Sequence, residues 1–299
     1  MDHRGGLDVQ VLPGRGEVTS FRPALAPDLL RGKTAWITGG GTGLGRAMAL
    51  RFAALGASVA LSGRRLEPLE AVAGEIVEAG GRAAAAPCDV RDPGQVDAAL
   101  AKVRETIGIP DILVNNAAGN FLCASEDLTP NGFATIVAIV LHGTFLCTRA
   151  AGRLWIEEKR GGTVLSIATT YATTGSGFVL PSACAKAGVV ALTRSLAVEW
   201  ARHGIRLNAI APGPIPTEGA FSRLLPTPEL EQARKRRIPA GRFGTQEELA
   251  ELAAFLVSDA SDWMRGEIVT FDGGEWLRGA GEFNDLLERG DTSLFRSNL

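Results

Sequence analysis

Thr38-Gly39-Gly40-Gly41-Thr42-Gly43-Leu44-Gly45 joins a short apolar run, Thr34–Thr38, to a helical stretch that starts at Gly45. Glycine lets the main chain turn tightly and approach a ligand closely, and the first turn of the following helix presents free N–H groups. A strand, a glycine-rich turn and a helix in this order indicate a site for a pyrophosphate group. The alternative, a glycine-rich turn that binds nothing, accounts less well for the flanking strand and helix.

Apolar runs and helical stretches alternate along the rest of the chain, which predicts a parallel sheet covered by helices on both faces. We therefore expect an α/β protein with one doubly wound domain of Rossmann type over 31–275, an N-terminal arm over 1–30 and a tail over 276–299. Residues 212–240 and the chain after Gly274 are predicted to be irregular, and 212–240 would form a lid over a substrate. The expected strands are Thr34–Thr38, Ser58–Leu61, Arg82–Ala86, Ile112–Val114, Thr163–Ser166, Arg206–Ile210 and Ile268–Phe271, and the expected helices include Gly45–Leu55, Leu66–Ala79, Pro93–Ile107 and Leu180–His203.

The charge and the apolar runs of the chain argue against two classes of partner. The 299 residues carry a formal net charge of -2, so bulk electrostatics does not attract nucleic acid or anionic membrane. No run of eighteen apolar residues occurs, and the arm mixes acids with arginines, so we expect neither membrane insertion nor a signal peptide. These features predict a cytoplasmic protein that acts on a small molecule.

The spacing of cysteine and histidine predicts neither disulfides nor a metal site. The four cysteines are scattered without a CxxC pair, and His3, His142 and His203 are far apart in the sequence. A zinc site usually shows such residues at short, regular spacing. We therefore expect no metal.

The spacing of the glycine-rich turn, TGxxxGxG, resembles that of the short-chain dehydrogenase/reductase family, and further segments match this family in order. The resemblance covers residues 30 to 275 and implies a nicotinamide dinucleotide bound at the turn and a homo-oligomer, a tetramer in the family. It implies contacts to adenine from Asp89-Val90, to the cofactor cleft from Asn116-Ala117, and to the nicotinamide amide from Pro212-Gly213-Pro214-Ile215.

The end of the second expected strand, Leu61-Ser62-Gly63-Arg64-Arg65, bears on the choice between NADH and NADPH. Enzymes of this class that use NAD usually have an acid there, which binds the ribose hydroxyls and would repel a 2′-phosphate. A guanidinium pairs with a phosphate instead. Because no acid is present, Arg64 predicts NADPH as the cofactor, whereas Arg65 also fits a solvated arginine at the start of a helix.

The catalytic region departs from the usual pattern of the family. A typical member has Tyr-x-x-x-Lys, but Pro181-Ser182-Ala183-Cys184-Ala185-Lys186 has a serine at the tyrosine position. A serine hydroxyl is a far weaker acid than a phenol, so ordinary alcohol–ketone chemistry is not expected. The chain has a single tyrosine, Tyr171, which follows the fifth expected strand.

One branch of the family shows this same arrangement, namely the 2,4-dienoyl-CoA reductases of the mitochondrial type. The segments that resemble it are Asn115–Phe121, Gly175–Val179, Gly219–Leu224 and Gly281–Asp285. In that branch an Asn, a Tyr eleven residues before a Ser, and a Ser-x-x-x-Lys pair form the site. The resemblance therefore implies that the catalytic residues are Asn120, Tyr171, Ser182 and Lys186.

The implied reaction is the NADPH-dependent reduction of a 2,4-dienoyl-CoA to a 3-enoyl-CoA. Hydride addition to the δ-carbon moves charge onto the thioester oxygen, and one preplaced donor stabilises such an oxyanion by roughly 3–4 kcal/mol. Tyr171 and Asn120 would donate, and water or Tyr171 would then protonate the α-carbon. Lys186 would hold the nicotinamide ribose, and Ser182 would orient the nicotinamide or a water. Each residue alone has a structural alternative, such as packing for Tyr171 or a turn for Asn120, but the four together favour an enzyme.

The same resemblance suggests how an acyl-CoA would be held. Arg91 and Arg223 would contact the substrate, and Phe121 would flank its acyl chain. The run Arg234-Lys235-Arg236-Arg237 could reach the phosphates of coenzyme A, although a solvated helix face is the favoured interpretation. His142 stands where the family usually has an Asn. It either replaces that Asn in a proton relay or, the favoured interpretation, is a hydrogen-bonded core histidine.

Three classes of function follow from the sequence. The first is an NADPH-dependent 2,4-dienoyl-CoA reductase, and the second is another reductase of this fold that acts on a different enoyl or keto substrate. The third is a catalytically weak dinucleotide-binding protein used in regulation or assembly. Lys186, Tyr171 and Asn120 argue against the third, and the segments around Phe121 and Arg223 argue against the second.

Overall fold

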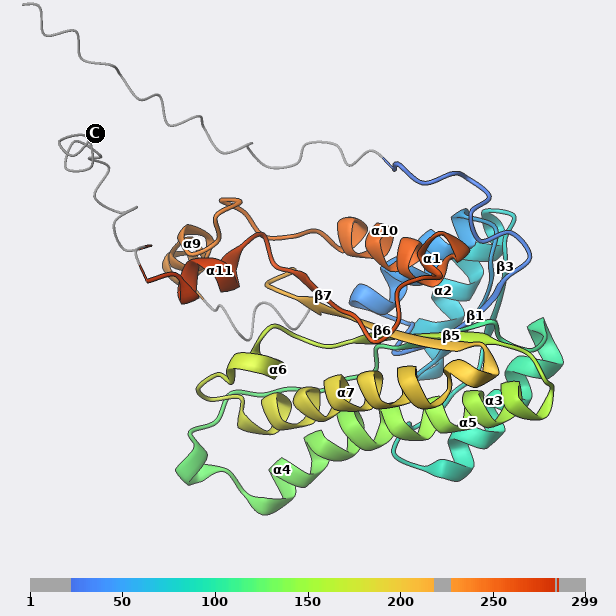
Figure 1. Ribbon diagram of the computed structural model, residues 1–299, viewed down its shortest axis with the longest axis horizontal. Helices are drawn as coiled ribbons and strands as arrows, with labels where there is room; N and C mark the ends of the chain where they lie inside the picture. The colour runs from blue at the N-terminus through green and yellow to red at the C-terminus, as the bar shows by residue number, and fades with distance from the viewer. Residues whose placement is uncertain (1–22, 218–226, 283, 285–299) are drawn as a thin grey trace, which may run out of the picture.

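The computed structural model describes residues 23–217, 227–282 and 284. Within these residues one parallel sheet has seven strands in the order β3-β2-β1-β4-β5-β6-β7 (Figure 1). The order reverses between β1 and β4, and doubly wound sheets bind ligands beyond the carboxyl ends of the strands at this point. The strands are β1 (Thr34–Thr38), β2 (Ser58–Ser62), β3 (Arg82–Ala85), β4 (Ile112–Asn115), β5 (Gly162–Ile167), β6 (Ile205–Pro212) and β7 (Ile268–Phe271).

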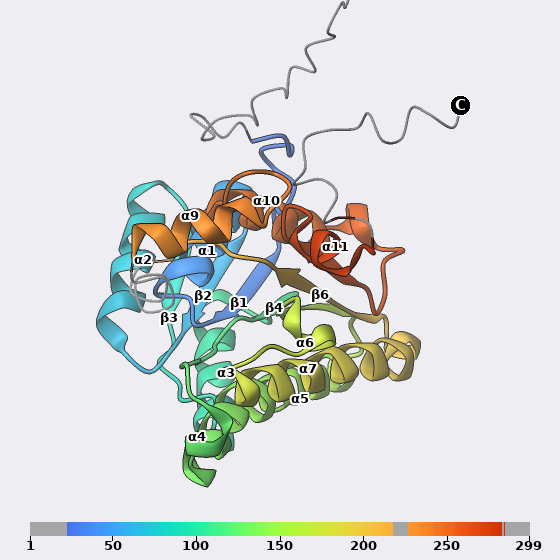
Figure 2. The same cartoon turned by 90° about the vertical axis from the view of Figure 1, so that its left-hand side faces the viewer.

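Helices cover both faces of the sheet, which confirms the predicted α/β, doubly wound fold (Figures 1 and 2). One face carries α1 (Gly43–Ala54), α2 (Leu66–Glu78) and α10 (Gln246–Val257), and the other carries α3 (Pro93–Ile107), α5 (Gly143–Glu157) and α7 (Leu180–Glu199). The other helical segments are α4 (Pro130–Val137), a π-helical turn (Ala138–His142), α6 (Tyr171–Thr174), α9 (Pro228–Arg236), α11 (Glu275–Ala280) and the 3-10 turns Ser125–Asp127, Ala201–His203 and Asp259–Ser261.

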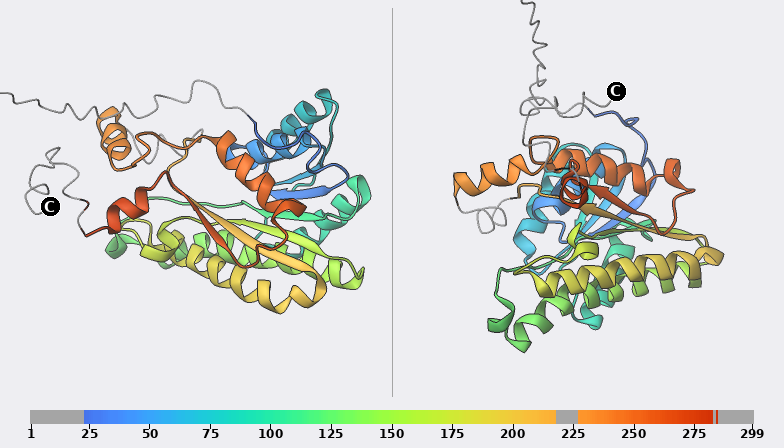
Figure 3. Two further views of the ribbon diagram at one scale, coloured as in Figure 1. Left: turned by 45° about the horizontal axis from the view of Figure 1, so that its top comes forward. Right: turned by 60° about the vertical axis from the view of Figure 1, so that its left-hand side comes forward.

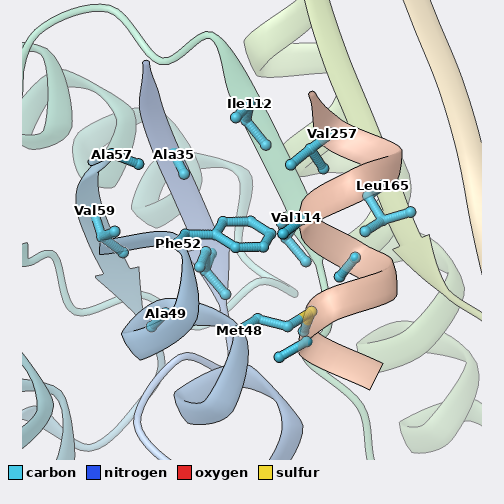
Figure 4. Close-up of a cluster of buried hydrophobic side chains, with 14 of the residues drawn as sticks. Ala35, Met48, Ala49, Phe52, Ala57, Val59, Ile112, Val114, Leu165 and Val257 are labelled. Carbon is cyan, nitrogen blue, oxygen red and sulfur yellow. The ribbon is translucent and has the colours of Figure 1, made fainter. Parts of the chain in front are cut away.

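The core on the first face lies between α1, α10 and the middle of the sheet. Met48 and Phe52 of α1 are fully buried and extend toward Val114 and Leu165 of the sheet and Val257 of α10 (Figure 4). Full burial of one such side chain stabilises the fold by about 1.5–3 kcal/mol. This packing holds the start of α1, and with it the glycine-rich turn, against the sheet.

The helical segment Pro130–Glu157 is long and apolar enough to cross a membrane by length and composition. Two of its apolar side chains, Cys147 and Trp155, are fully buried in the core that the segment shares with α3 and the sheet. A helix hydrophobic enough to span a bilayer is also what the interior of a large α/β domain requires. The segment is therefore a core helix of this domain.

The prediction of irregular structure for 212–240 and after Gly274 is wrong in part, because both stretches contain a helix. The helix α9 starts with Thr227, whose Oγ1 accepts a hydrogen bond from the Leu230 N–H at 3.4 Å, followed by Pro228. These are standard features of a helix start. The sequence of α9, PELEQARKR, has almost no apolar residues, so it lacks the periodic pattern on which the prediction relied.

One buried cation ties β6 to the end of α10. The guanidinium of Arg206, whose residue is 3% exposed, donates to the carbonyl oxygens of Leu256 and Ser258 at 2.7 Å each. It also donates to Ser261 Oγ at 2.9 Å. Buried carbonyl groups that lose their donors cost free energy because water does not replace the donor.

We expect Arg206→Leu to lower the free energy of unfolding by about 2–3 kcal/mol, since several buried acceptors lose a charged donor together. Thermal melting followed by circular dichroism measures this as a lower Tm. The matched control is Arg153→Leu, which removes an exposed ion pair with Glu157 and should cost less than about 1 kcal/mol. Equal melting of the two variants would contradict a structural role for Arg206.

Candidate active site

A cavity of about 740 Å³ opens beyond the carboxyl ends of β1, β2 and β4. Its size falls in the range of small-molecule and cofactor sites. It lies where the strand order reverses, as expected for a dinucleotide site in a doubly wound sheet. The predicted cofactor residues that line it are Gly39, Gly41, Thr42, Gly43, Leu44, Arg64, Asp89, Val90, Asn116 and Ala117.

Two glycines of the turn serve packing and do not line the cavity. A Cβ on Gly45 would lie 2.1 Å from the Gly39 carbonyl oxygen, and one on Gly40 would lie 2.7 Å from Leu61 Cδ2. The contact at Gly45 is with backbone, so this glycine lets α1 approach the glycine-rich turn, whereas Gly40 lets the turn pack against Leu61 of β2. The N-cap of α1, Thr42, makes no side-chain capping hydrogen bond, so the first N–H groups of α1 are available to a ligand. The geometry fits a pyrophosphate at this helix end.

Asn116 and Thr38 hold the turn against the end of β4. The Asn116 side-chain amide donates to the Thr38 and Gly39 carbonyl oxygens, both at 3.1 Å. Thr38 Oγ1 accepts from the N–H groups of Asn116 at 3.0 Å and Ala117 at 3.1 Å. Asn116, predicted to line the cofactor cleft, therefore also fixes the shape of the phosphate-binding turn.

The edge of the cavity near β2 and β3 is rich in charge. Arg64 and Arg65 both line it, so the interpretation of Arg65 as a merely solvated residue is incomplete. Asp89 also lines it and accepts a hydrogen bond from Arg91 Nε at 2.9 Å. Hydrogen bonds from Arg91 hold the pKa of the Asp89 carboxyl below its usual value. Arg91, predicted to contact the substrate, is thus paired with Asp89 in this structure.

The segment predicted to touch the nicotinamide is beside the cavity and not in its lining. Pro212 ends β6, and the Gly213 N–H donates to the Phe271 carbonyl oxygen of β7 at 2.9 Å. Pro214 accepts from the Gly244 N–H at 3.2 Å, and Ile215 packs near Gly244. Their role toward the cofactor stays a prediction.

Several residues that line the cavity are not among the predicted cofactor residues. Gly63, Cys88 and Ala118 adjoin predicted residues, so position along the motifs indicates them. Nothing in the sequence pattern marks the others, because only the fold brings them to the cavity from outside the motifs. These are Pro68, Leu69, Ile139 and Thr217.

The structure brings three of the four predicted catalytic residues into one hydrogen-bonded group. The hydroxyl of Tyr171, at the start of α6, lies 3.1 Å from Ser182 Oγ on α7. The Asn120 side-chain amide donates to the same hydroxyl at 3.4 Å. The loops that carry these residues are joined by the Cys123 N–H, which donates to the Phe178 carbonyl oxygen at 2.9 Å. Tyr171 is therefore the centre of the group.

Lys186 lies one turn after Ser182 on the same face of α7. Its residue is 7% exposed, and its ammonium donates to the carbonyl oxygen of Ile167, the last residue of β5. An ammonium has three donors, and the other two have no partner among the described residues. Burial lowers the pKa of Lys186 to about 8, so the group stays mostly charged at neutral pH.

The interpretation of His142 as a core histidine is wrong, because this residue is exposed at the end of the π-helical turn. The side chain of the turn that packs on α7 is Val140, which is fully buried with Ala185 and Val189. An apolar valine cannot pass a proton to Lys186, so this turn offers no side-chain relay at that position. Of the remaining substrate predictions, Phe121 is described and exposed, whereas Arg223 lies outside the described residues.

Comparison with known proteins identifies relatives of the whole domain. A family model described as enoyl-(acyl carrier protein) reductase matches residues 39–275. An uncharacterized oxidoreductase of Caenorhabditis elegans is 55% identical over 84% of this chain and 82% of its own length. A probable 2,4-dienoyl-CoA reductase of the same organism, named as (3E)-enoyl-CoA-producing, is 48% identical over 85% of this chain and 83% of its own length. A probable 2,4-dienoyl-CoA reductase of Bacillus subtilis, named as (2E)-enoyl-CoA-producing, is 46% identical over 82% of this chain and 97% of its own length.

Solved structures agree with these relatives. A short-chain dehydrogenase of Bacillus anthracis has a TM-score of 0.75 and 42% identity, and the match covers 84% of this chain and 98% of that one. A putative 2-deoxy-D-gluconate 3-dehydrogenase of Agrobacterium tumefaciens, solved with bound NADP, has a TM-score of 0.77 and 36% identity over 85% of this chain and 100% of that one. The chain therefore belongs to the short-chain dehydrogenase/reductase family of oxidoreductases, which use a nicotinamide dinucleotide.

Proposed function

We propose that this protein is an NADPH-dependent 2,4-dienoyl-CoA reductase that forms a 3-enoyl-CoA and acts in the degradation of unsaturated fatty acids. The observation that carries the proposal is the position of the Tyr171 hydroxyl, between Ser182 Oγ at 3.1 Å and the Asn120 amide at 3.4 Å. The phenol comes from α6, whereas the position on α7 where the family usually has its tyrosine holds Ser182. The named dienoyl-CoA reductases among the relatives support the same substrate class.

The group around Tyr171 suits an oxyanion better than an alcohol product. The bound dinucleotide would supply a hydride to the δ-carbon of the dienoyl thioester. The thioester oxygen would then accept hydrogen bonds from the Tyr171 hydroxyl and the Asn120 amide as its negative charge develops. Ser182 would orient the Tyr171 hydroxyl through their shared hydrogen bond. A water or Tyr171 would protonate the α-carbon.

Lys186 would bind the ribose hydroxyls of the nicotinamide with the two donors that Ile167 leaves available. Its positive charge also lies one helical turn from Ser182, where it favours a negative charge on the substrate. The ammonium is buried, so water screens its charge less than on the surface.

Exposed apolar side chains beside Tyr171 would contact the acyl chain. Phe121 and Leu122 follow Asn120 directly and are 37% and 54% exposed, and Phe178, which is 63% exposed, lies on the loop before α7. The hydrogen bond between Cys123 and Phe178 holds these two loops together. Exposed apolar residues that are close together are typical of a binding surface for an apolar ligand.

The proposal includes NADPH as the reductant, because Arg64 lines the cavity at the end of β2 and no acid occupies that strand end. A guanidinium there would pair with the 2′-phosphate of NADPH. It also includes a homotetramer, on the family resemblance alone, and the cytoplasm as the site of action.

We expect rapid oxidation of NADPH with 2,4-hexadienoyl-CoA and little with 3-oxoacyl-CoA or simple ketones. A ketone reduction must end with a proton on oxygen, which favours a phenol where this chain has Ser182. Absorbance at the NADPH band measures the rates, and product analysis locates the remaining double bond. A 3-enoyl product is expected from protonation at the α-carbon.

A 2-enoyl product would mean protonation at the γ-carbon, and the proposed product would be wrong while the substrate class stands. Preference for a ketone over every dienoyl thioester would favour another reductase of this fold. Absence of turnover with both substrate classes, together with tight NADPH binding, would favour a dinucleotide-binding protein with a regulatory role.

A further inference from the structure

The basic run Arg234–Arg237 contains two pairs of residues with different surroundings. Arg234 lies 3.0 Å from a carboxylate oxygen of Glu275, and Lys235 lies 2.8 Å from one of Glu231. These two charges are therefore balanced. Arg236 and Arg237 are exposed and have no ion-pair partner in the part of the chain that the structure describes. The interpretation of the whole run as a solvated helix face thus fails to account for the contrast between the pairs.

Arg236 and Arg237 line a pocket of about 620 Å³ between α9 and α11, together with Ala233 and Arg278. Ala233, Arg236 and Arg237 are three and four residues apart, so they share one face of α9. Three of the four lining residues are arginines, and the described lining has no carboxylate. Guanidinium groups bind phosphate oxygens through paired, charge-assisted hydrogen bonds.

Contacts between the two helices and the segments next to them place the arginines around one pocket. The ion pair between Arg234 and Glu275 joins α9 to α11. Beyond α9, Ile238 is buried, and the Ala240 N–H donates to the Gly273 carbonyl oxygen at 3.1 Å. The small side chain of Ala233 leaves the pocket open between the arginines.

The pocket lies at the end of the molecule that carries the catalytic group. Both α9 and α11 lie near the same end of the sheet as α6, which starts with Tyr171 (Figures 1 and 3). The pocket shares no lining residue with the cavity of the glycine-rich turn. It is therefore separate from the cavity that Arg64 lines.

We propose that the pocket between α9 and α11 binds the 3′-phospho-ADP end of coenzyme A thioesters. This inference rests on the proposed function. In such a thioester the pantetheine arm separates the acyl group from several phosphate charges, so a substrate whose acyl group meets Tyr171 needs a cationic site some way off. Arg236, Arg237 and Arg278 supply these cations in the pocket between α9 and α11.

The test is the double variant Arg236→Gln/Arg237→Gln. With 2,4-hexadienoyl-CoA its KM should rise roughly tenfold, with kcat retained, because charged hydrogen bonds to the phosphates are lost. With 2,4-hexadienoyl-pantetheine, which lacks the nucleotide, wild type and variant should behave alike. The matched control is Lys102→Gln/Arg202→Gln, which removes two exposed cations elsewhere and should leave both KM values unchanged.

A second variant keeps both arginines, so it tests the pocket even if the double variant folds poorly. Ala233→Glu puts a carboxylate into the pocket on a helix that tolerates glutamate well, and it should raise the KM for the CoA thioester in the same way. An unchanged KM of NADPH would show that each variant has kept the cofactor site. If neither variant changes the KM for the CoA thioester, the pocket does not bind the nucleotide.

Direct binding separates this inference from the proposed function. Calorimetric titration of 3′,5′-ADP into protein saturated with NADP+ should show binding to wild type and its loss in Arg236→Gln/Arg237→Gln. Inorganic phosphate, titrated in parallel, should bind more weakly, and equal affinity would overturn the assignment to a nucleotide. If wild type binds 3′,5′-ADP through these arginines but does not reduce dienoyl-CoA, the proposed function fails and the pocket stands. If wild type reduces dienoyl-CoA and the variants do so equally well, the proposed function stands and the assignment of the pocket fails.

Discussion

Tyr171→Phe should lower kcat with 2,4-dienoyl-CoA by about a hundredfold or more. The phenol would donate to an oxygen that becomes negatively charged in the transition state, and loss of one such donor typically costs 10²–10³-fold in turnover. The amide of Asn120 would remain, so some activity should persist. Ser182→Ala should cost less, because Ser182 would act on the oxygen through the Tyr171 hydroxyl, 3.1 Å away.

Steady-state kinetics at saturating NADPH measures both variants. A suitable control is Ser176→Ala, which removes an exposed hydroxyl whose hydrogen bond goes to the neighbouring Gly177 carbonyl oxygen. Near-native turnover of Tyr171→Phe would make Tyr171 a packing residue and would end the oxyanion assignment. A larger loss for Ser182→Ala than for Tyr171→Phe would reverse the roles of the two hydroxyls.

Arg64→Ala should weaken NADPH binding roughly ten- to hundredfold and leave NADH binding nearly unchanged. A charge-assisted hydrogen bond contributes about 1.5–3 kcal/mol, and only NADPH carries the 2′-phosphate that would receive it. Binding is measured by fluorescence titration of the two reduced dinucleotides. The wild-type protein should accordingly bind NADPH much more tightly than NADH.

The control for this variant is Arg46→Ala, which removes a cation from α1 that already pairs with Glu75 at 2.5 Å. It should change neither affinity by much, since exposed ion pairs contribute little. Equal affinity of the native protein for NADPH and NADH would overturn the choice of cofactor. If Arg64→Ala lowers the affinity for NADPH and NADH equally, Arg64 shapes the cavity and does not bind the 2′-phosphate.

The fold could be predicted because the patterns that specify its strands and helices lie within short stretches of sequence. The order of apolar runs and helical stretches predicted all seven strands of the described sheet within two residues at either end. Glycine is required at position 45 because a Cβ there would lie 2.1 Å from the Gly39 carbonyl oxygen, so the residue type itself indicates the turn. The two helices in the stretches predicted to be irregular, α9 and α11, have little apolar periodicity and are joined by the ion pair between Arg234 and Glu275, which no short window of sequence contains.

The candidate site was predictable only where motifs carry it. Asn120, Tyr171 and Ser182 were chosen from the sequence, and the structure places them in one hydrogen-bonded group. His142 was misread because its burial depends on which side of the π-helical turn faces α7, and that side carries Val140. The pairing of Arg91 with Asp89 could not be chosen over a contact with substrate without side-chain geometry.

The sequence by itself determined the class of the fold, the glycine-rich turn and the residue types available for catalysis, because each depends on neighbours within a few residues. Only the tertiary structure decided which hydroxyl lies at the centre of the group, since Tyr171 and Asn120 are 51 positions apart in the sequence. It also decided that Arg236 and Arg237 face a pocket while Arg234 and Lys235 are paired. Adjacent cations are equivalent in a sequence, and they become different only when helix packing gives some of them a carboxylate and others an open cavity.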